Sequence, residues 1–244
     1  MKSKPEYLDL TKISLFLDLD GTLAPIMPRP DDVVPDKRRT KLLKDLQSRL
    51  EGRLAVISGR DTSTIDYILE QSVMSVAGVH GLQRRTAFGE RMDAVASEAL
   101  EAVADVFTDM KKTHDGLLVE DKGLSVAVHY RHAPEAKEDI INKAQALAEK
   151  NGLSLQAGHE VIELRTPGPN KGDAIQAFMN EAPFMGHRPV FVGDDLTDEV
   201  GFVMARQAGG FGVKVGGGRS EADYALSDPE AVLNWLEESL LCLT

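Results

Sequence analysis

The chain has almost no cysteine, few aromatic residues and no long hydrophobic run. Cys242 is the single cysteine among 244 residues, which excludes an intrachain disulfide and a zinc site built from several thiolates. No segment approaches the roughly 18–20 apolar residues that a membrane-spanning helix needs, and the first residues lack the apolar run of a secretory signal. We therefore expect a soluble, cytoplasmic protein with no membrane partner.

Positive charge is also in short supply. The sequence has 28 lysine and arginine residues against 39 aspartate and glutamate residues, which gives a formal net charge of −11. Such a surface repels nucleic acids, because it has no excess of cations to replace the counterions of phosphate. We therefore expect no nucleic-acid partner, although an acidic protein can bind a single phosphate when a metal ion lies between them.

The composition, with 42% hydrophobic and 27% charged residues, is that of a globular protein. In both terminal parts of the chain, short apolar runs alternate with helical patterns, which indicates parallel strands joined by crossover helices. The predicted strands are 13–19, 54–57, 75–79, 190–192 and 211–215, and the predicted helices are 36–50, 61–71, 172–180, 197–206 and 229–241. This pattern predicts the α/β class, with a Rossmann-like, doubly wound parallel sheet.

The middle of the chain has a different order of elements. Its pattern predicts a long amphipathic helix over 92–110, two strands, a second helix and two more strands, which is typical of a small α+β domain with an antiparallel sheet. The later elements are expected at 117–120, 124–130, 135–150, 153–157 and 161–164. We predict a core domain of residues 1–80 and 167–244, with an α+β cap domain of residues 81–166 inserted into it.

Paired carboxylates follow the first predicted strand, in Asp18-Leu19-Asp20-Gly21-Thr22. Ligands of open α/β sheets gather at the carboxyl ends of strands, so Asp18 and Asp20 are expected at a site. Two neighbouring carboxylates repel each other unless a cation or a shared proton relieves them. The alternative is a solvated turn, because aspartate and glycine are common in turns.

Two further motifs indicate phosphate binding. Ser58-Gly59-Arg60 lies between a strand and a helix, where free N–H groups and the helix dipole favour an anion. Lys171 opens a helix, a position that the dipole disfavours unless an anion lies nearby. The alternatives are that Ser58 only caps its helix and that Lys171 is a solvated surface lysine.

The fourth motif is acidic and follows the strand 190–192. Gly193-Asp194-Asp195-Leu196-Thr197-Asp198-Glu199 has four carboxylates within six residues, and such hard oxygen ligands suit Mg²⁺. Part of the motif can be explained by helix capping, a role that fits Asp195 or Glu199 better than Asp194.

The order of these four motifs resembles that of the haloacid dehalogenase superfamily of phosphotransferases. More narrowly, the chain resembles the trehalose-6-phosphate phosphatases. The residues that carry the narrower resemblance are the four motifs together with His80-Gly81, Asn170-Lys171-Gly172, Val119-Glu120-Asp121-Lys122-Gly123 and Val161-Ile162-Glu163-Leu164-Arg165. One departure is Thr166, where the family often has a proline after the arginine.

The resemblance implies phosphoryl transfer in two steps through an aspartyl-phosphate. Asp18 would be the nucleophile, and Asp20 would act as general acid and then as general base. Mg²⁺ would be held by Asp18, the Asp20 carbonyl and Asp194, with Asp195 and Asp198 orienting its surroundings. The residues expected to bind phosphate are Thr22, Ser58, Gly59, Arg60 and Lys171.

The resemblance also implies that the cap domain selects the substrate. Glu120, Lys122 and Glu163 would bind the sugar of trehalose 6-phosphate; the alternative for them is an exposed face with cross-strand charge pairs. His80 and His129 are expected to have structural roles. Other substrates remain open, among them sucrose 6-phosphate and mannosyl-3-phosphoglycerate, as does a non-catalytic sugar-phosphate sensor. We expect a monomer with a functional link to a trehalose-6-phosphate synthase.

Overall fold

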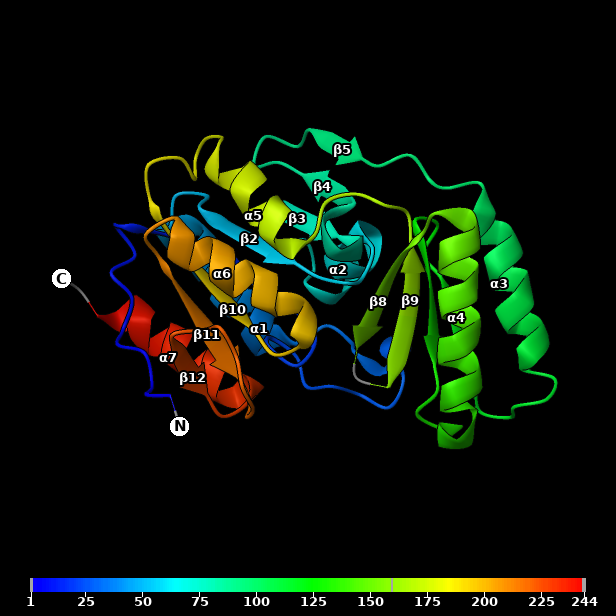
Figure 1. Cartoon of the computed structure of the whole chain (residues 1–244). Coiled ribbons are helices and arrows are strands. Elements are labelled where there is room, and N and C mark those ends of the chain that lie inside the picture. Colours follow the sequence, from blue (N-terminus) through cyan, green and yellow to red (C-terminus); the bar gives the residue numbers. More distant parts are fainter. Residues whose placement is uncertain (1, 159, 243–244) are drawn as a thin grey trace. The chain divides into compact units, whose positions relative to one another are not determined.

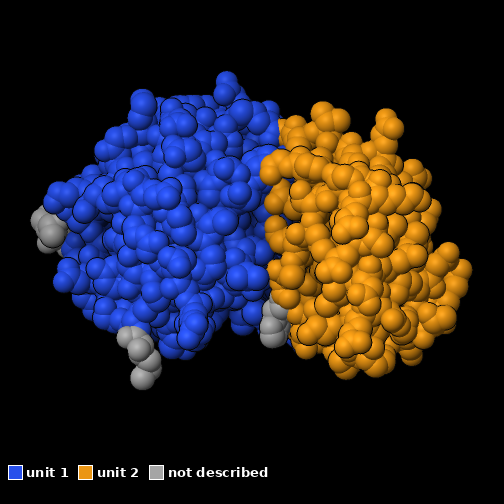
Figure 2. All heavy atoms as spheres, viewed as in Figure 1, with its two compact units in different colours: residues 1–92, 169–244 blue, residues 93–168 orange. Residues whose placement is uncertain are grey.

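The chain folds into two units. The computed structural model describes residues 2–158 and 160–242. Unit 1 comprises Met1–Met92 and Pro169–Thr244, and unit 2 comprises Asp93–Gly168 (Figure 2). The inserted unit therefore begins twelve residues later than the predicted start at residue 81, because two short strands after residue 81 extend the main sheet of unit 1. Within the described residues, no helix has the length and apolar character that crossing a bilayer requires.

Unit 1 contains an eight-stranded sheet in the order β12-β11-β10-β1-β2-β3-β4-β5 (Figure 1). The strands are β1 (Ile13–Leu17), β2 (Leu54–Ile57), β3 (Ser75–Gly78), β4 (Gln83–Arg85), β5 (Arg91–Asp93), β10 (Arg188–Gly193), β11 (Phe211–Val215) and β12 (Tyr224–Leu226). The strands from β12 to β3 in this order are parallel to one another, and β4 pairs antiparallel with β3. The predicted α/β class with a parallel sheet is confirmed.

Helices cover both faces of this sheet. They are α1 (Lys37–Arg49), α2 (Thr62–Ile68), α5 (Lys171–Met179), α6 (Glu199–Gln207) and α7 (Pro229–Leu241). Strand side chains alternate between the two faces: Phe16 packs with Phe178 of α5 and Phe202 of α6, whereas Leu15 packs in a separate core with Trp235 of α7. Figure 1 shows α5 and α6 together on one face of the sheet. Burial on both faces explains why the central strands are continuous apolar runs.

Unit 2 is an α+β unit. Its antiparallel sheet has the order β6-β7-β9-β8, and two long helices pack on one face of it (Figure 1). The elements are α3 (Ala99–Met110), β6 (Leu118–Asp121), β7 (Ser125–His129), α4 (Lys137–Asn151), β8 (Ser154–Gly158) and β9 (Val161–Arg165). Phe107 and Ile140 from the helices meet Val126 and Leu164 from the strands in its core. Short 3-10 turns complete the chain at η1 (Pro30–Asp32), η2 (Val79–Gly81), η3 (Pro134–Ala136) and η4 (Leu196–Asp198).

The predicted helix over 92–110 is wrong at its start. Helix α3 begins at Ala99, Met92 belongs to β5, and Val95 is 87% exposed between them. Met92 and Val95 have the spacing of a helical apolar face, but neither has a core to pack on. The strands β4, β5 and β12 were not predicted, because three residues are too few to show an alternating pattern.

Candidate active site

The first and fourth motifs meet at the carboxyl edge of the parallel sheet. Asp18 follows β1, and Asp194 follows β10, the neighbouring strand. The Asp18 N–H donates to the carbonyl of Val192 at 2.9 Å, so the ladder between these two strands continues into the motif. Ser58 follows β2 on the other side of β1. The register of three adjacent parallel strands therefore places these residues side by side.

Lys171 lies at the centre of this edge. It is the first residue of α5, whose N-cap Asn170 accepts a hydrogen bond from the backbone of Asp173. Its Nζ lies 2.9 Å from Oδ1 of Asp18 and 2.6 Å from Oδ1 of Asp198, and only 3% of its side chain is exposed. The alternative of a solvated surface lysine is therefore wrong. The two carboxylates offset the unfavourable position of a cation at a helix N-terminus.

Asp198 organises the acidic loop. It is fully buried, its Oδ1 accepts from Lys171, and its Oδ2 accepts from the backbone N–H groups of Asp194 and Asp195 at 2.9 Å each. Asp195 is the N-cap residue of η4, the kind of capping position that the sequence allowed for it. Both oxygens of Asp198 are thus already engaged by groups of the protein itself.

Three carboxylates of this edge can share a cation. Oxygens of Asp18, Asp194 and Asp198 lie within 4.8 Å of one another. Within the described residues, Oδ1 of Asp194 is buried with no hydrogen-bond partner. An orphaned buried carboxylate oxygen among acidic neighbours is what a hard divalent cation such as Mg²⁺ satisfies, so these residues fit the predicted metal. Because Asp198 is already engaged, Asp18 and Asp194 are the better ligands, and the role of the Asp20 carbonyl stays a prediction.

The charges of this cluster are unbalanced. Burial raises the pKa of Asp18 well above its ordinary value; Lys171 opposes this shift, and the charges of Asp198 and Asp194 add to it. Burial also raises the pKa of Asp194 to about 7, with a further contribution from Asp198. Buried carboxylates that share one lysine favour protonation, and a bound cation would reverse this preference.

A glycine makes room for Asp194. Gly21 has a φ of +77°, a backbone conformation that other residues rarely adopt, and a Cβ at this position would lie 2.1 Å from Oδ2 of Asp194. The turn after β1 therefore passes directly over the carboxylate from β10. Any larger residue at position 21 would displace it.

Asp20 lies in a different environment from Asp18. Its carboxylate forms a bidentate ion pair with Arg60, with Nε to Oδ2 at 2.7 Å and Nη2 to Oδ1 at 2.8 Å. Asp20 is not among the three carboxylates that can share a cation. Arg60, predicted to bind phosphate, is thus held by the predicted acid–base residue, and no pattern along the chain indicates this pairing.

Ser58 and Thr22, two of the residues predicted to bind phosphate, are both buried. Ser58 is buried, and its Oγ accepts from the backbone N–H of Arg60 at 3.2 Å. It does not cap the following helix, because the N-cap of α2 is Asp61. Thr22 is buried, and its Oγ1 has no hydrogen-bond partner in the described part of the chain. Ser58 and Thr22 thus place two hydroxyls in the loops that directly follow β2 and β1.

The segment that leaves β3 and the segment that enters α5 are neighbours within unit 1. The N–H of His80 donates to the carbonyl of Ser58 at 2.9 Å, so the end of β3 is fixed to the second motif. The next residue, Gly81, has a φ of +109°, and a Cβ there would lie 2.9 Å from the carbonyl oxygen of Asn170. Asn170 directly precedes Lys171, so the outgoing and returning segments touch beside this lysine.

In unit 2, the three predicted sugar-binding residues share one face of the sheet. Glu120 pairs with Ala127 of β7, and Ala127 pairs with Glu163 of β9, so both glutamates lie on the face opposite the helices. Nζ of Lys122 lies 3.9 Å from Glu120 and 3.6 Å from Glu163. The structure thus brings Glu120, Lys122 and Glu163 together within unit 2.

Two residues of β7 join this group. Ser125 donates a short hydrogen bond to Glu163, and Nε2 of His129 lies 3.2 Å from Oε2 of Glu120. Neither residue was among the predicted sugar-binding residues. The alternation of Ser125, Ala127 and His129 along a strand is the signal that could have placed them on the face of Glu120 and Glu163.

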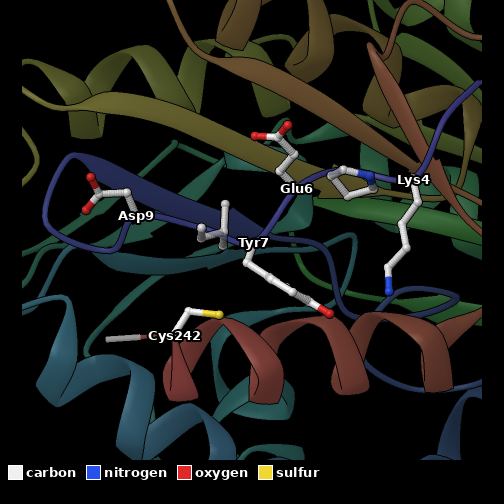
Figure 3. A pocket seen from close by; sticks show the side chains of 7 residues that line it. Lys4, Glu6, Tyr7, Asp9 and Cys242 are labelled. Atoms are coloured by element: carbon white, nitrogen blue, oxygen red, sulfur yellow. The ribbon is translucent and has the colours of Figure 1, made fainter. Parts of the chain in front are cut away.

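A separate pocket lies where the N-terminal segment meets the end of α7 (Figure 3). It is lined by Lys4, Pro5, Glu6, Tyr7, Leu8, Asp9 and Cys242. This set includes no residue of the four motifs, so the pocket is unrelated to the carboxylate cluster.

Comparisons with known proteins agree with this geometry. The profile of the trehalose-phosphatase family matches residues 16–230. The chain is 39% identical over 232 residues to trehalose-6-phosphate phosphatase of Escherichia coli (strain K12), an alignment that covers 93% of this chain and 86% of that protein.

Solved structures show the same fold. A trehalose-6-phosphate phosphatase related protein superposes with a TM-score of 0.77 at 26% identity, covering 94% of this chain and 97% of the other. A haloacid dehalogenase-like hydrolase from Bacteroides thetaiotaomicron superposes with a TM-score of 0.64 at 16% identity, covering 93% and 98%, which shows a likeness of fold alone.

Proposed function

Because the chain belongs to the trehalose-phosphatase family of the haloacid dehalogenase superfamily and is a phosphoric monoester hydrolase, we propose that it hydrolyses trehalose 6-phosphate to trehalose and inorganic phosphate in a Mg²⁺-dependent reaction. The observation that carries the proposal is the buried contact of Lys171 with Asp18 and Asp198, next to the orphaned oxygen of Asp194. Attack on a phosphate ester needs a nucleophile, here a carboxylate, and a neighbouring cation that binds the phosphate oxygens.

Asp18 is the proposed nucleophile. Its carboxylate oxygen forms a bond to phosphorus while the bond from phosphorus to the sugar oxygen breaks, which leaves an aspartyl-phosphate and the free sugar. Lys171 holds Oδ1 of Asp18 at 2.9 Å, so the direction of the carboxylate is fixed before substrate arrives. An ionised carboxylate needs no separate base for this step.

Asp20 is the proposed proton carrier. It protonates the departing sugar oxygen and then takes a proton from the water that hydrolyses the aspartyl-phosphate. In the structure it is held by Arg60 through two hydrogen bonds, so this ion pair must open before Asp20 can donate a proton. Arg60 is then released to bind the phosphate, as the sequence predicted.

The remaining phosphate contacts come from the loops around Asp18. The hydroxyls of Thr22 and Ser58, the backbone N–H of Gly59 and the ammonium of Lys171 would hold the phosphate oxygens as charge moves onto them. Mg²⁺ on Asp18, Asp194 and the Asp20 carbonyl would neutralise the repulsion between nucleophile and phosphate. Asp198 positions Lys171 and the loop of Asp194, and Asp195 would orient water around the metal.

Unit 2 is proposed to recognise the sugar. Glu120, Lys122 and Glu163 form a compact polar group that can accept from, and donate to, several hydroxyl groups of one disaccharide. A site built to hydrogen-bond hydroxyls discriminates strongly against substrates that lack them. A synthase that makes the disaccharide phosphate is the functional partner that this reaction implies.

Phosphate release from a panel of sugar phosphates tests the proposal. Trehalose 6-phosphate, sucrose 6-phosphate, mannosyl-3-phosphoglycerate and glucose 6-phosphate are compared at equal concentration, with Mg²⁺ and with excess chelator. The proposal predicts the highest kcat/KM for trehalose 6-phosphate and loss of activity with chelator. Preference for another sugar phosphate would overturn the assignment of trehalose 6-phosphate as the substrate. Absence of phosphate release from all of them under Mg²⁺ would favour a non-catalytic sensor.

A further inference from the structure

His129 lies next to Glu120 on the polar face of the unit 2 sheet. In the register of β6 and β7, His129 is opposite Leu118 and Ala127 is opposite Glu120, so His129 and Glu120 are diagonal neighbours on the same face. Long side chains in such diagonal positions reach each other. Nε2 of His129 lies 3.2 Å from Oε2 of Glu120, and the imidazole donates this hydrogen bond when its proton is on Nε2.

The two oxygens of Glu120 have different surroundings. The contacts from His129 at 3.2 Å and from Lys122 at 3.9 Å are both to Oε2. Oε1 makes no hydrogen bond within residues 2–158 and 160–242. Burial would raise the pKa of Glu120, but the hydrogen bond from His129 and the charge of Lys122 outweigh it, so the pKa lies below its ordinary value. Glu120 is therefore an ionised acceptor with one oxygen fixed and the other available.

The second glutamate of this face is held in the same way. Ser125, also from β7, donates to Oε1 of Glu163, and Lys122 approaches that same oxygen at 3.6 Å. Strand β7 thus supplies one hydrogen-bonding partner to the carboxylate from β6 and one to the carboxylate from β9. The repetition indicates that β7 orients both glutamates, while Lys122 lies between them.

We propose that His129 is a positioning residue for substrate recognition: it fixes Oε2 of Glu120 so that Oε1 accepts a hydrogen bond from a sugar hydroxyl. The proposal rests on the proposed function, because the ligand of Oε1 is a hydroxyl of the sugar phosphate. His129 acts through Glu120 and does not itself contact the substrate. An unfixed glutamate would lose rotamer freedom on binding, and this cost would appear as weaker binding.

A double-mutant cycle tests this assignment. His129→Phe keeps a planar ring but removes the donor, and Glu120→Gln removes the charged acceptor. We expect His129→Phe to raise KM for trehalose 6-phosphate about fivefold, the cost of ordering one side chain on binding, while kcat changes less than twofold. Because both residues act through one interaction, the double variant should have the KM of Glu120→Gln alone. His129→Gln, which keeps an N–H donor, should recover part of the loss.

The matched control is His114→Phe. His114 belongs to the same unit but faces Asp139 of α4 at 3.9 Å, away from the polar face, so KM should stay at the wild-type value. The positioning role would be overturned if the KM increases of the two single variants multiplied in the double variant. It would also be overturned if His129→Phe left KM unchanged. A fall in kcat together with a lower melting temperature would also overturn it in favour of a structural role. Failure of the wild-type protein to hydrolyse trehalose 6-phosphate would overturn the proposed function itself, and is seen before any variant is compared.

Discussion

The ammonium of Lys171 lies 2.9 Å from the carboxylate of Asp18, and more than nine-tenths of each side chain is buried. The same ammonium is 2.6 Å from Asp198. One lysine therefore compensates several acidic groups that the sheet brings to one edge, and the stability of the site depends on it.

Replacing Lys171 with methionine should destabilise the metal-free protein strongly. The change leaves buried carboxylates without their counter-ion, and breaking a buried pair in this way costs about 3–5 kcal/mol. The free energy of unfolding, measured with urea in the presence of chelator, should fall by that order, and Mg²⁺ should restore part of it. Lys41→Met, at the exposed pair with Asp45, is the control and should leave the unfolding midpoint unchanged. Equal effects of the two substitutions would contradict the prediction.

Asp18→Asn should separate activity from stability. Loss of the nucleophile should lower kcat for trehalose 6-phosphate at least about a thousandfold. The metal-free protein should be no less stable than the wild type, because burial and the neighbouring carboxylates already favour an uncharged group at this position. Phosphate release and thermal unfolding measure the two effects, with Asp31→Asn in the exposed turn η1 as control. A variant that keeps more than a tenth of the wild-type kcat would rule out Asp18 as the nucleophile.

Stabilisation by Mg²⁺ should increase with pH. Burial, with a contribution from Asp198, raises the pKa of Asp194 to about 7, so the folded protein binds this proton more tightly than the unfolded chain. The contribution of Asp194 to the stability of the metal-free protein therefore falls as pH rises from about 4 through 7, whereas the metal requires the deprotonated carboxylate. The difference in melting temperature with and without Mg²⁺ should be larger at pH 8 than at pH 6. A difference that shrinks or stays constant would contradict the assignment, and Asp194→Asn should abolish the trend.

Lys122→Ala should weaken recognition of the sugar more than the chemistry on phosphate. Lys122 lies between Glu120 and Glu163, so its loss removes a donor and leaves two carboxylates on one face without their shared cation. KM for trehalose 6-phosphate should rise about tenfold, as expected for the loss of one charged hydrogen bond. Comparison with p-nitrophenyl phosphate, which has no sugar, measures the selectivity of the effect. Lys143→Ala on the exposed side of α4 is the control, and equal losses on both substrates would exclude a role in specificity.

The carboxylate cluster was predictable because its geometry follows from the sheet. Asp18 and Asp194 each come directly after a buried apolar strand, and parallel neighbours end at the same edge. Lys171 was predictable because a cation at a helix N-terminus needs an anion nearby. The ion pair between Asp20 and Arg60 was not, because it depends on the side-chain conformations of two loops. No spacing along the chain encodes such a contact.

The start of helix α3 was misplaced for a related reason. Met92 and Val95 are three residues apart, as on one face of a helix, but the segment holds an edge strand and an exposed connection. Periodicity indicates a helix only where the apolar face has something to pack on. By contrast, the pattern of β7 does indicate where His129 and Ser125 lie. Alternate residues of a strand share one face of the sheet, which places both of them on the face of the two glutamates.

The contact of Gly81 with Asn170 has a consequence for how this chain could be remodelled. The backbone that departs after β3 and the backbone that enters α5 are already in contact, so residues 82–168 form an excursion whose two ends nearly coincide. This excursion consists of the edge strands β4 and β5 followed by unit 2. Closing such a gap costs little chain entropy and needs only a short linker. The parallel strands from β12 to β3 could therefore accept a different insert in place of β4, β5 and unit 2, or none, with Lys171 still anchored at the start of its helix. Exchange of the insert is then a route by which the same phosphate chemistry could acquire a new substrate.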